Sequence, residues 1–394
     1  MDRNMKKWHS YKLSDVVRFN PSERLLKGEI AKKVPMDLLQ PYTRGISGFE
    51  MASYTGGSKF RNGDTLMARI TPCLENGKTA YVSMLDEDEV GFGSTEYIVF
   101  RNIEGITDNK FVYYFVTSPW FRDIAVKSMV GSSGRQRVQQ AMLENLVVNL
   151  PPLAEQKQIA GILGALDDKI ELNRCINDNL EEQAKALFNH YFIQNTENLG
   201  EWQDGVLTDI AQYLNGLAMQ KYPAMPNEAG LPVLKIKELG QGQCDTNSDR
   251  CSSLIKPEYI ISDGTIIFSW SGTLLVDIWC GGKCGLNQHL FKVSSAKYPQ
   301  WFVFYWTKHH LNKFIRIAKD KAVTMGHIKR CDLEISKVKI PSKQALVNLD
   351  KLFSPIFNRM VTCRIENRKL SSLRDTLLPK LMSGELSVEE VSLD

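Results

Sequence analysis

Residues 153–192 have the sequence LAEQKQIAGILGALDDKIELNRCINDNLEEQAKALFNHYF, which predicts one long helix. It contains no proline, and Pro151 and Pro152 stand immediately before it, where prolines suit the first turn of a helix. Alternating steps of four and three residues follow a heptad seam, which is typical of a helix that packs along another helix. About 40 residues at ~1.5 Å each make a helix of roughly 60 Å. The seam consists of Ile159, Leu163, Leu166, Ile170, Asn173, Asn177, Leu180, Ala184, Leu187 and Tyr191.

The same seam recurs about 190 residues later in the chain. The residues before it also match, because Leu150-Pro151 corresponds to Ile340-Pro341. A period of this length is too long for a solenoid repeat and indicates a duplicated unit of one globular segment and one helix. The second seam consists of Leu349, Phe353, Ile356, Met360, Cys363, Asn367, Leu370, Arg374, Leu377 and Leu381.

Each seam needs an apolar partner, which is the other helix, a helix of another protein, or both. Acidic residues outnumber basic ones in 154–193, and basic residues outnumber acidic ones in 356–385, so opposite charge favours mutual pairing. We expect an antiparallel pair that holds two similar globular segments apart, related by an approximate two-fold axis. The positions expected to pair are Ile159, Leu163, Leu166, Ile170, Leu180, Leu187, Leu349, Phe353, Ile356, Met360, Leu370 and Leu377.

The predicted fold class is therefore α+β, with two mixed α/β globular domains and two long antiparallel coiled-coil helices. Ser354-Pro355 predicts a kink or a fresh start of the second helix, with Ser354 as its cap. The acidic tail after Gly384 is expected to be frayed. The expected divisions are a first globular domain, 1–150; a first helical region, 151–195; a second globular domain, 196–341; a second helical region, 342–385; and a tail, 386–394.

The two globular segments show the same order of features. In each, a glycine turn precedes an apolar strand, a further strand follows, and an aromatic helical stretch leads to a polar loop. Asn62–Met67 corresponds to Asp263–Phe268, and Ser94–Ile98 to Asn287–Phe291. The loop Gly131–Arg137 corresponds to Ala322–Arg330.

Composition is that of an ordinary globular protein of 394 residues with a net charge of +4. The first residues lack the apolar core of a signal peptide, and no stretch approaches the roughly 20 apolar residues of a membrane span. We expect a cytoplasmic protein whose eight scattered cysteines are reduced thiols. Cys280, Cys284 and His289 lack a fourth ligand and the spacing of a common zinc site, so no metal is expected.

No catalytic motif is present in the sequence. Asn76-Gly77-Lys78-Thr79 ends like a phosphate-binding loop, but Pro72 stands where that motif needs its first glycine. The sequence has no H-E-x-x-H, no G-x-S-x-G and no stretch of the adenine-methylating type. We therefore expect a binding protein without a catalytic site.

The polar loops are the candidate contacts with double-stranded DNA. Arginine and glutamine recognise base edges in the major groove, and serine hydroxyls and lysines hold phosphates. For each side chain alone, an ordinary solvated loop residue is an equally good interpretation. The candidates are Arg69, Lys78, Ser132, Ser133, Arg135, Gln136 and Arg137 in the first domain, and Ser269, Ser271, Thr324, His327, Lys329 and Arg330 in the second.

The chain resembles the specificity (S) subunit of type I restriction-modification systems. The resemblance rests on Leu150–Ile159, LPPLAEQKQI, and Leu377–Glu385, LLPKLMSGE, with Gly93–Val99, Asn287–Phe291 and Met325–Lys329. It covers nearly the whole chain, although the head of the second helix, Ile340–Leu346, departs from the usual motif.

The resemblance implies two target recognition domains, each recognising half of a split DNA sequence, and helices that act as a spacer. It also implies that the helices dock two methyltransferase (M) subunits, and that restriction (R) subunits join the complex. No cofactor is implied for this chain, since S-adenosylmethionine belongs to the M subunit, and ATP and Mg²⁺ to the R subunit. Two alternatives remain: a coiled-coil interaction scaffold without DNA specificity, and an enzyme with an unrecognised site near Cys280–His289.

Overall fold

The computed structural model describes residues 8–194, 202–320 and 326–391. The chain divides into two compact units, each described here by itself. Unit 1 comprises Met1–Glu171 and Leu370–Asp394, and unit 2 comprises Leu172–Lys369. Each unit therefore contains one globular segment and a portion of each long helix. The five divisions expected from the sequence follow secondary structure, whereas these units follow contacts, so the expected boundaries stay a prediction.

The two long helices predicted from the seams are present. Helix α5 spans Leu153–Phe188 and continues into a π-helical turn, η3, at Asn189–Gln194. Helix α10 spans Lys343–Ser383. The fold-class prediction of two mixed α/β segments and two long helices is thus confirmed.

Of the two alternatives expected at Ser354-Pro355, the fresh start of a helix capped by Ser354 is wrong, and the kink stays a prediction. Helix α10 continues through both residues, and the Ser354 hydroxyl donates to Asp350 Oδ1 (2.6 Å) inside the helix. Proline removes one backbone hydrogen bond. The buried Phe353 and Phe357 flank Pro355 and anchor this turn in the core, so packing offsets the missing bond.

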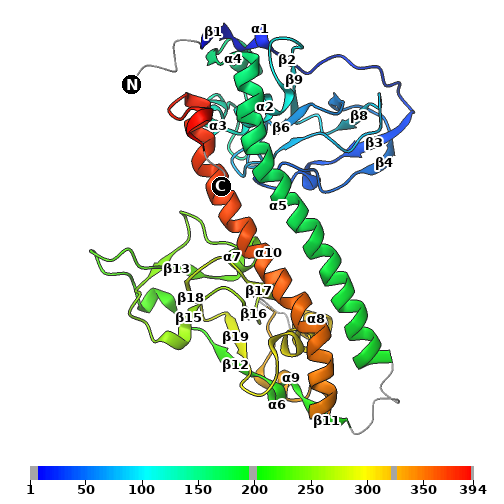
Figure 1. The fold of residues 1–394 in the computed structure, drawn as a ribbon, viewed down its shortest axis with the longest axis vertical. Coiled ribbons are helices and arrows are strands. Elements are labelled where there is room, and N and C mark those ends of the chain that lie inside the picture. The colour runs from blue at the N-terminus through cyan, green and yellow to red at the C-terminus, as the bar shows by residue number, and fades with distance from the viewer. Residues whose placement is uncertain (1–7, 195–201, 321–325, 392–394) are drawn as a thin grey trace. The chain divides into compact units, whose positions relative to one another are not determined.

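Unit 1 contains two four-stranded sheets and a two-stranded ladder (Figure 1). The first sheet has the order β2-β9-β6-β7 and is antiparallel. The second has the order β4-β3-β8-β5, in which β3 and β8 are parallel. Strands β1 and β10 form the ladder. The strands are β1 (His9–Lys12), β2 (Val17–Phe19), β3 (Ile30–Val34), β4 (Glu50–Ser53), β5 (Lys59–Phe60), β6 (Thr65–Ala68), β7 (Thr79–Tyr81), β8 (Gly91–Gly93), β9 (Tyr97–Asn102) and β10 (Val147–Leu150).

Short helices complete unit 1. Helix α2 packs against β6, β7 and β9. It ends before Ser118, whose hydroxyl accepts from the Phe121 amide (3.3 Å) and caps α3. The two helices α2 and α3 are thus separated at Ser118, and Pro119 stands at the first position of α3. The helical elements are α1 (Leu13–Val16), η2 (Met36–Leu38), α2 (Asn109–Thr117), α3 (Pro119–Lys127), α4 (Gln140–Glu144) and η7 (Val388–Glu390).

Strands β6 and β9 are covered on both faces, which explains their continuous apolar sequence. Met67 and Ile98 belong to the core that also contains α2 and the long helices. Their neighbours Leu66 and Val99 point the opposite way, into a second cluster beside β3 and β5.

Unit 2 repeats this topology strand for strand. Its sheets have the orders β12-β19-β16-β17 and β14-β13-β18-β15, again with one parallel pair, β13 and β18. Strands β11 and β20 form the matching ladder. The strands are β11 (Gln203–Val206), β12 (Gln212–Asn215), β13 (Leu231–Leu234), β14 (Arg250–Cys251), β15 (Ile260–Ile261), β16 (Thr265–Ser269), β17 (Leu275–Trp279), β18 (Cys284–Leu286), β19 (Leu290–Ser294) and β20 (Lys337–Ile340).

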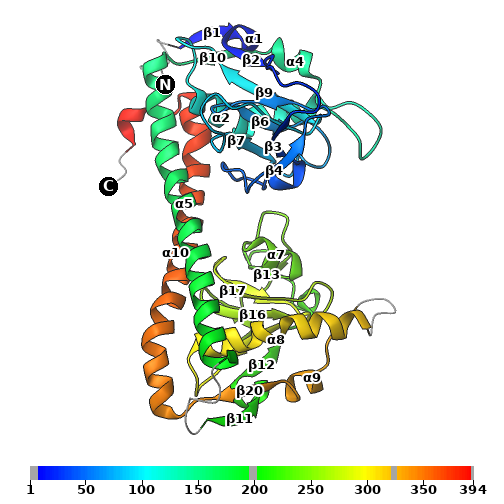
Figure 2. The ribbon, with the colours of Figure 1, turned by 90° about the vertical axis from the view of Figure 1, so that its right-hand side faces the viewer.

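One helix, α8, takes the place of α2 and α3 in unit 2 and contacts β17 and β19. Figure 2 shows α8 together with β16 and β17 of the same unit. The equal sheet orders in both units support the duplication inferred from the sequence. The helical elements of unit 2 are α6 (Leu207–Ile210), η5 (Met219–Lys221), α7 (Ile236–Gln241), η6 (Pro257–Tyr259), α8 (Gln300–Asp320) and α9 (Arg330–Glu334).

Within unit 1, the start of α5 packs against the end of α10. Ile159 and Leu163 share a core with Leu378 and Leu381. Beside them, Arg374 Nη1 lies 2.7 Å from Asp167 Oδ1, and the Tyr114 hydroxyl donates to Asp167 Oδ2 (2.8 Å). Asp167 is 2% exposed, so this ion pair lies inside the unit.

Within unit 2, the end of α5 packs against the start of α10. Phe188 and Phe192 share a core with Leu349 and Phe353. Farther along, Asn173 Nδ2 donates to Asn367 Oδ1 (3.0 Å) and to Glu366 Oε2 (2.9 Å). In unit 1 the start of α5 contacts the end of α10, and in unit 2 the end of α5 contacts the start of α10. The two helices therefore pair in antiparallel orientation.

The predicted pairing positions lie on the covered faces of both helices. Ile356 and Leu377 are only half-buried, whereas their neighbours Phe357 and Leu378 are buried at 2% and 6% exposure. The pattern therefore misses two packing residues by one position each. Buried are Ile159, Leu163, Leu166, Ile170, Leu349, Phe353 and Met360; half-buried are Leu180, Leu187, Ile356, Leu370 and Leu377.

The expectation of a frayed tail is wrong for residues 384–391. Leu386, Val388 and Val391 pack against the core of unit 1, and Ser387 N donates to Glu390 Oε2 (2.9 Å). The acidic residues alternate with apolar ones, and the apolar side chains hold the segment. Residues 392–394 lie outside the described residues.

Several charged residues of the two long helices form ion pairs with residues of the globular segments rather than with the other long helix. Arg44, in the segment between η2 and β4, pairs with Asp168 and Glu171 of α5. In unit 2, Arg364 of α10 pairs with Asp277 (2.7 Å). Further pairs of this kind join Glu181 to Lys308 and Arg368 to Asp263. In the part of the chain that the structure describes, no helix has the length and apolar character needed to cross a membrane.

Candidate nucleic-acid interface

The predicted loop of unit 1 is fixed by backbone hydrogen bonds at its end. The amide of Val138 donates to Arg69 O (2.9 Å), and the amide of Thr71 donates to Gln136 O (3.0 Å). On the other side, Arg137 N donates to Val130 O (2.9 Å), and Val130 N donates to Arg137 O (3.0 Å). Arg137 is therefore held between two chain segments. We call residues 69–71, 94–96 and 130–138 the first cradle.

Glu96 orients the Arg137 side chain. Arg137 Nε lies 3.0 Å from both carboxylate oxygens of Glu96, and Nη2 lies 2.6 Å from Oε1. The Glu96 backbone is itself fixed, because its carbonyl accepts from Arg69 N (2.9 Å) and its amide donates to Ser94 Oγ (3.1 Å). The hydrogen bonds that Arg137 donates to Glu96 raise the pKa of Arg137, which therefore stays charged.

The other predicted residues of the first domain fall into two groups. Ser132, Ser133 and Arg135 are exposed, and Gln136 is half-buried in the same loop. Arg69 and Lys78 are instead engaged within the domain. Arg69 Nη2 donates to Val138 O (3.1 Å), and Lys78 Nζ donates to Met36 O (2.9 Å). The structure thus brings Arg69 and Arg137 together and directs Lys78 elsewhere.

Unit 2 builds the same backbone arrangement, which we call the second cradle (residues 270–272, 287–289 and 326–328). Ile328 N donates to Trp270 O (3.1 Å), and Gly272 N donates to Gly326 O (3.0 Å). Trp270 N donates to His289 O (3.4 Å), as Arg69 N does to Glu96 O. These bonds make the positions of Trp270, His289 and His327 equivalent to those of Arg69, Glu96 and Arg137.

The side chains of the second cradle are aromatic rather than charged. The Trp270 ring centroid lies 6.0 Å from that of His289 and 6.4 Å from that of His327. Trp270 Nε1 donates to Asn215 Oδ1 (2.9 Å), and Ser271 Oγ shares a hydrogen bond with His289 Nδ1 (2.9 Å). The cradle thus presents rings and imidazole nitrogens where the first presents a guanidinium and a carboxylate.

Two predicted residues of the second domain are not accessible in this structure. Ser269 is 0% exposed, and its hydroxyl donates to Thr273 O (2.8 Å). Ser271 is 3% exposed and is bonded to His289. Both residues lie at or just after the end of strand β16, and their hydroxyls form hydrogen bonds within the domain. Their predicted contact with DNA stays untested.

The remaining predicted residues lie at the start of α9. His327, Lys329 and Arg330 are exposed, and Arg330 Nε lies 3.9 Å from Glu334 Oε1. The Lys329 amide donates to Asp332 Oδ2 (2.8 Å), which caps α9. Thr324 lies outside the described residues.

Sequence reasoning missed Glu96 and His289. Both occupy the third position of the corresponding segments Ser94–Ile98 and Asn287–Phe291. The correspondence was visible in the sequence, but the contact of each residue with the polar loop depends on the sheet register. Among the described residues, no group of three or more His, Cys, Asp or Glu side chains is placed to hold a metal ion.

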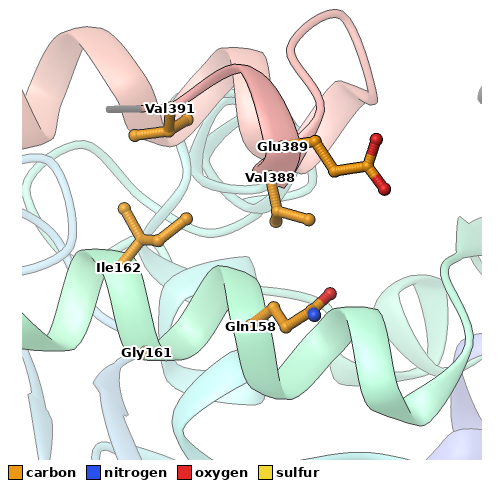
Figure 3. Close-up of a pocket in the computed structure, with 6 residues that line it drawn as sticks. All are labelled: Gln158, Gly161, Ile162, Val388, Glu389 and Val391. Carbon is orange, nitrogen blue, oxygen red and sulfur yellow. The ribbon is translucent and has the colours of Figure 1, made fainter. Parts of the chain in front are cut away.

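A separate groove of about 530 Å³ lies in unit 1 between the first turns of α5 and the tail (Figure 3). Ile162 on α5 faces Val388 and Val391 on the tail, and Gln158 and Glu389 stand at its polar side. One wall of the groove is therefore formed by the first turns of α5 and the other wall by the folded tail.

Comparisons with known proteins agree on one family. Residues 5–182 match the family model described as the type I restriction modification DNA specificity domain. The type I restriction enzyme MjaIX specificity subunit of Methanocaldococcus jannaschii is 27% identical over 321 residues, which is 74% of this chain and 73% of that protein. The type I restriction enzyme EcoAI specificity subunit of Escherichia coli is 33% identical over 207 residues, or 51% of this chain, but only 33% of that protein is covered.

A solved structure supports the same fold. The crystal structure of a type I restriction-modification system S subunit from M. genitalium aligns with 97% of this chain and 98% of its own, with a TM-score of 0.55. The sequence identity is 16%, so this likeness concerns the fold alone.

Proposed function

The chain belongs to the specificity subunits of type I restriction-modification systems, and from this premise we propose that it selects the DNA target of such a complex. Each globular segment recognises one half of a split target. The long helices act as the spacer and as the docking site for two methyltransferase subunits, and restriction subunits join the assembled complex. The chain itself is non-catalytic and works in the prokaryotic cytoplasm. S-adenosylmethionine, ATP and Mg²⁺ belong to the partner subunits.

The observation that carries this proposal is the pair of equivalent cradles. Equal backbone hydrogen bonds hold different side chains: Arg69, Glu96 and Arg137 in unit 1, and Trp270, His289 and His327 in unit 2. A rigid scaffold that carries variable polar side chains in loops is typical of recognition surfaces. Different side chains at equivalent positions recognise different bases, which fits an asymmetric target.

The exposed polar and basic residues beside each cradle are suited to contact DNA phosphates. Ser132, Ser133 and Arg135 in unit 1, and Lys329 and Arg330 in unit 2, are exposed. Phosphate contacts set orientation and salt dependence, whereas base contacts set sequence preference. The exposure of these hydroxyl and basic side chains beside each cradle supports the proposal that they contact phosphates.

The proposal is tested by mapping N6-methyladenine in cells that contain a matched methyltransferase subunit, with and without this chain. A split methylation motif that appears only with the chain is the expected result. An active methyltransferase subunit whose methylation pattern does not depend on the chain would contradict the proposal. In that case, duplex binding by the purified complex at increasing salt would favour the scaffold interpretation if only weak, salt-sensitive binding were found.

A further inference from the structure

Arg137 has the geometry of a base-recognising residue rather than of a phosphate contact. Its backbone is bonded to Val130, and its neighbours Gln136 and Val138 are bonded to Thr71 and Arg69. The position of its Cα atom is therefore defined before any ligand arrives. Arg135, only two residues away, is exposed near the tip of the same loop and has no ion-pair partner among the described residues.

The contact with Glu96 leaves one defined edge of the guanidinium available. A guanidinium has five N–H donors in a planar fork. Glu96 takes the edge formed by Nε and Nη2. The end formed by Nη1 and the second N–H of Nη2 has no hydrogen-bond partner in the described part of the chain. The Arg137 side chain as a whole is 46% exposed, which is compatible with a ligand at this end.

Charge decides which ligand suits this end. The Glu96 carboxylate lies against the guanidinium, is 23% exposed, and would repel a phosphate. An arginine neutralised in this way contributes little to the release of counterions from the DNA backbone. The two parallel N–H groups of the open end match guanine O6 and N7, which is the commonest specific arginine contact in the major groove.

We infer that Arg137 recognises a guanine in one half of the target and that Glu96 is the positioning residue that aims it. This inference rests on the proposed function and adds a base identity to it. The second cradle has His289 and His327 at the equivalent positions and lacks an arginine–carboxylate pair. The guanine contact therefore belongs to one half of the target.

The test measures base discrimination by the complex of this chain with its methyltransferase subunits. Binding to the mapped target is compared with binding to duplexes in which each G·C pair of either half is replaced in turn by A·T. The variants are Arg137→Lys, Arg137→Ala and Glu96→Gln. Arg135→Ala is the matched control in the same loop, and His327→Ala is the control in the second cradle.

At one position in one half of the target, the wild-type complex should prefer G·C over A·T. This preference should be about tenfold or more smaller in Arg137→Lys and Arg137→Ala. Lysine keeps the charge but cannot form the fork. Glu96→Gln should lower the preference at the same position by a smaller factor. It should also steepen the salt dependence of binding, because Arg137 is no longer neutralised. Arg135→Ala should weaken all duplexes equally and reduce the salt slope by about one. His327→Ala should leave that position unchanged.

An equal loss of affinity for every duplex in the Arg137 variants would overturn the inference, because it would indicate a phosphate contact or a structural role. Unchanged discrimination in Glu96→Gln would remove Glu96 as the positioning residue. Either result can occur while the wild-type complex still methylates a split motif, so failure of the inference is distinguishable from failure of the proposed function.

Discussion

The ion pair between Asp167 and Arg374 joins the two long helices inside unit 1. The Arg374 side chain is 11% exposed and that of Asp167 is 3% exposed. Removal of one partner from a buried ion pair leaves an uncompensated charge and costs about 3–5 kcal/mol. Arg374→Met should therefore lower the free energy of unfolding of unit 1 by about that amount, as measured by urea denaturation followed by tryptophan fluorescence.

Lys127→Met provides the matched control for Arg374→Met, because Lys127 forms an exposed ion pair with Asp123 on α3. Exposed pairs contribute about 0–1 kcal/mol. Equal losses of stability in the two variants would show that the buried pair contributes no more than a surface pair.

Asp263 gives unit 2 a defined dependence on pH. Hydrogen bonds from Arg368 lower the pKa of Asp263 below its ordinary value. A lowered folded-state pKa stabilises the protein above the unfolded-state pKa of about 3.9, and this stabilisation is lost as pH falls below about 4. Both side chains are about one-third exposed, so solvent screening limits the contribution to about 1 kcal/mol.

Arg368→Gln should therefore destabilise unit 2 at pH 7 but have a smaller effect near pH 3. The comparison is the difference in urea midpoint between wild type and variant at the two pH values, because the other carboxylates contribute equally to both proteins. An effect of Arg368→Gln that grows as the pH falls would contradict the assigned ion pair.

Among the secondary-structure elements, the sequence predicts the two long helices, the succession of strands and turns along each half of the chain, and the duplication, but not the order of the strands within the sheets. Each of these depends on a periodic pattern or on the order of turns and strands. The seam misses Phe357 and Leu378 because a helix turns every 3.6 residues and drifts from a 3.5-residue repeat. Both residues also face the core of a globular segment, which widens the apolar stripe.

The tail and the two cradles show what the sequence leaves open. Residues 384–391 are acidic, and their packing depends on where Leu386, Val388 and Val391 meet the core of unit 1. The residues that follow Ser269 in the sequence are typical of a loop, but Ser269 itself lies buried at the end of β16. Glu96 joins Arg137 through a sheet register that composition and local pattern do not specify.

Phe353 tests the joint packing of α10 with the globular part of unit 2. Its ring is stacked on Trp301, with 4.2 Å between centroids, and it is 0% exposed. Phe353→Ala should cost about 3–5 kcal/mol of unfolding free energy through lost burial and cavity formation. The neighbouring Leu352→Ala is the control, since Leu352 is 44% exposed and should cost far less. Similar losses in both variants, measured by urea denaturation, would contradict the packing of this helix face.

In the complete chain, we expect each unit to be an independent recognition module. The two cradles use equivalent backbone bonds within their own units. They carry different side chains, so each half of the target should depend on one unit. An exchange of residues 196–340 for the corresponding domain of another specificity subunit should therefore leave the half recognised by unit 1 intact.

Independent recognition by the two units is tested by mapping N6-methyladenine for this exchanged chain beside the wild-type chain, with the same methyltransferase subunit. We expect one half of the split motif to change to that of the donor, while the other half is unchanged. A change in both halves, or an unchanged motif in a chain that still supports methylation, would contradict recognition by two independent units.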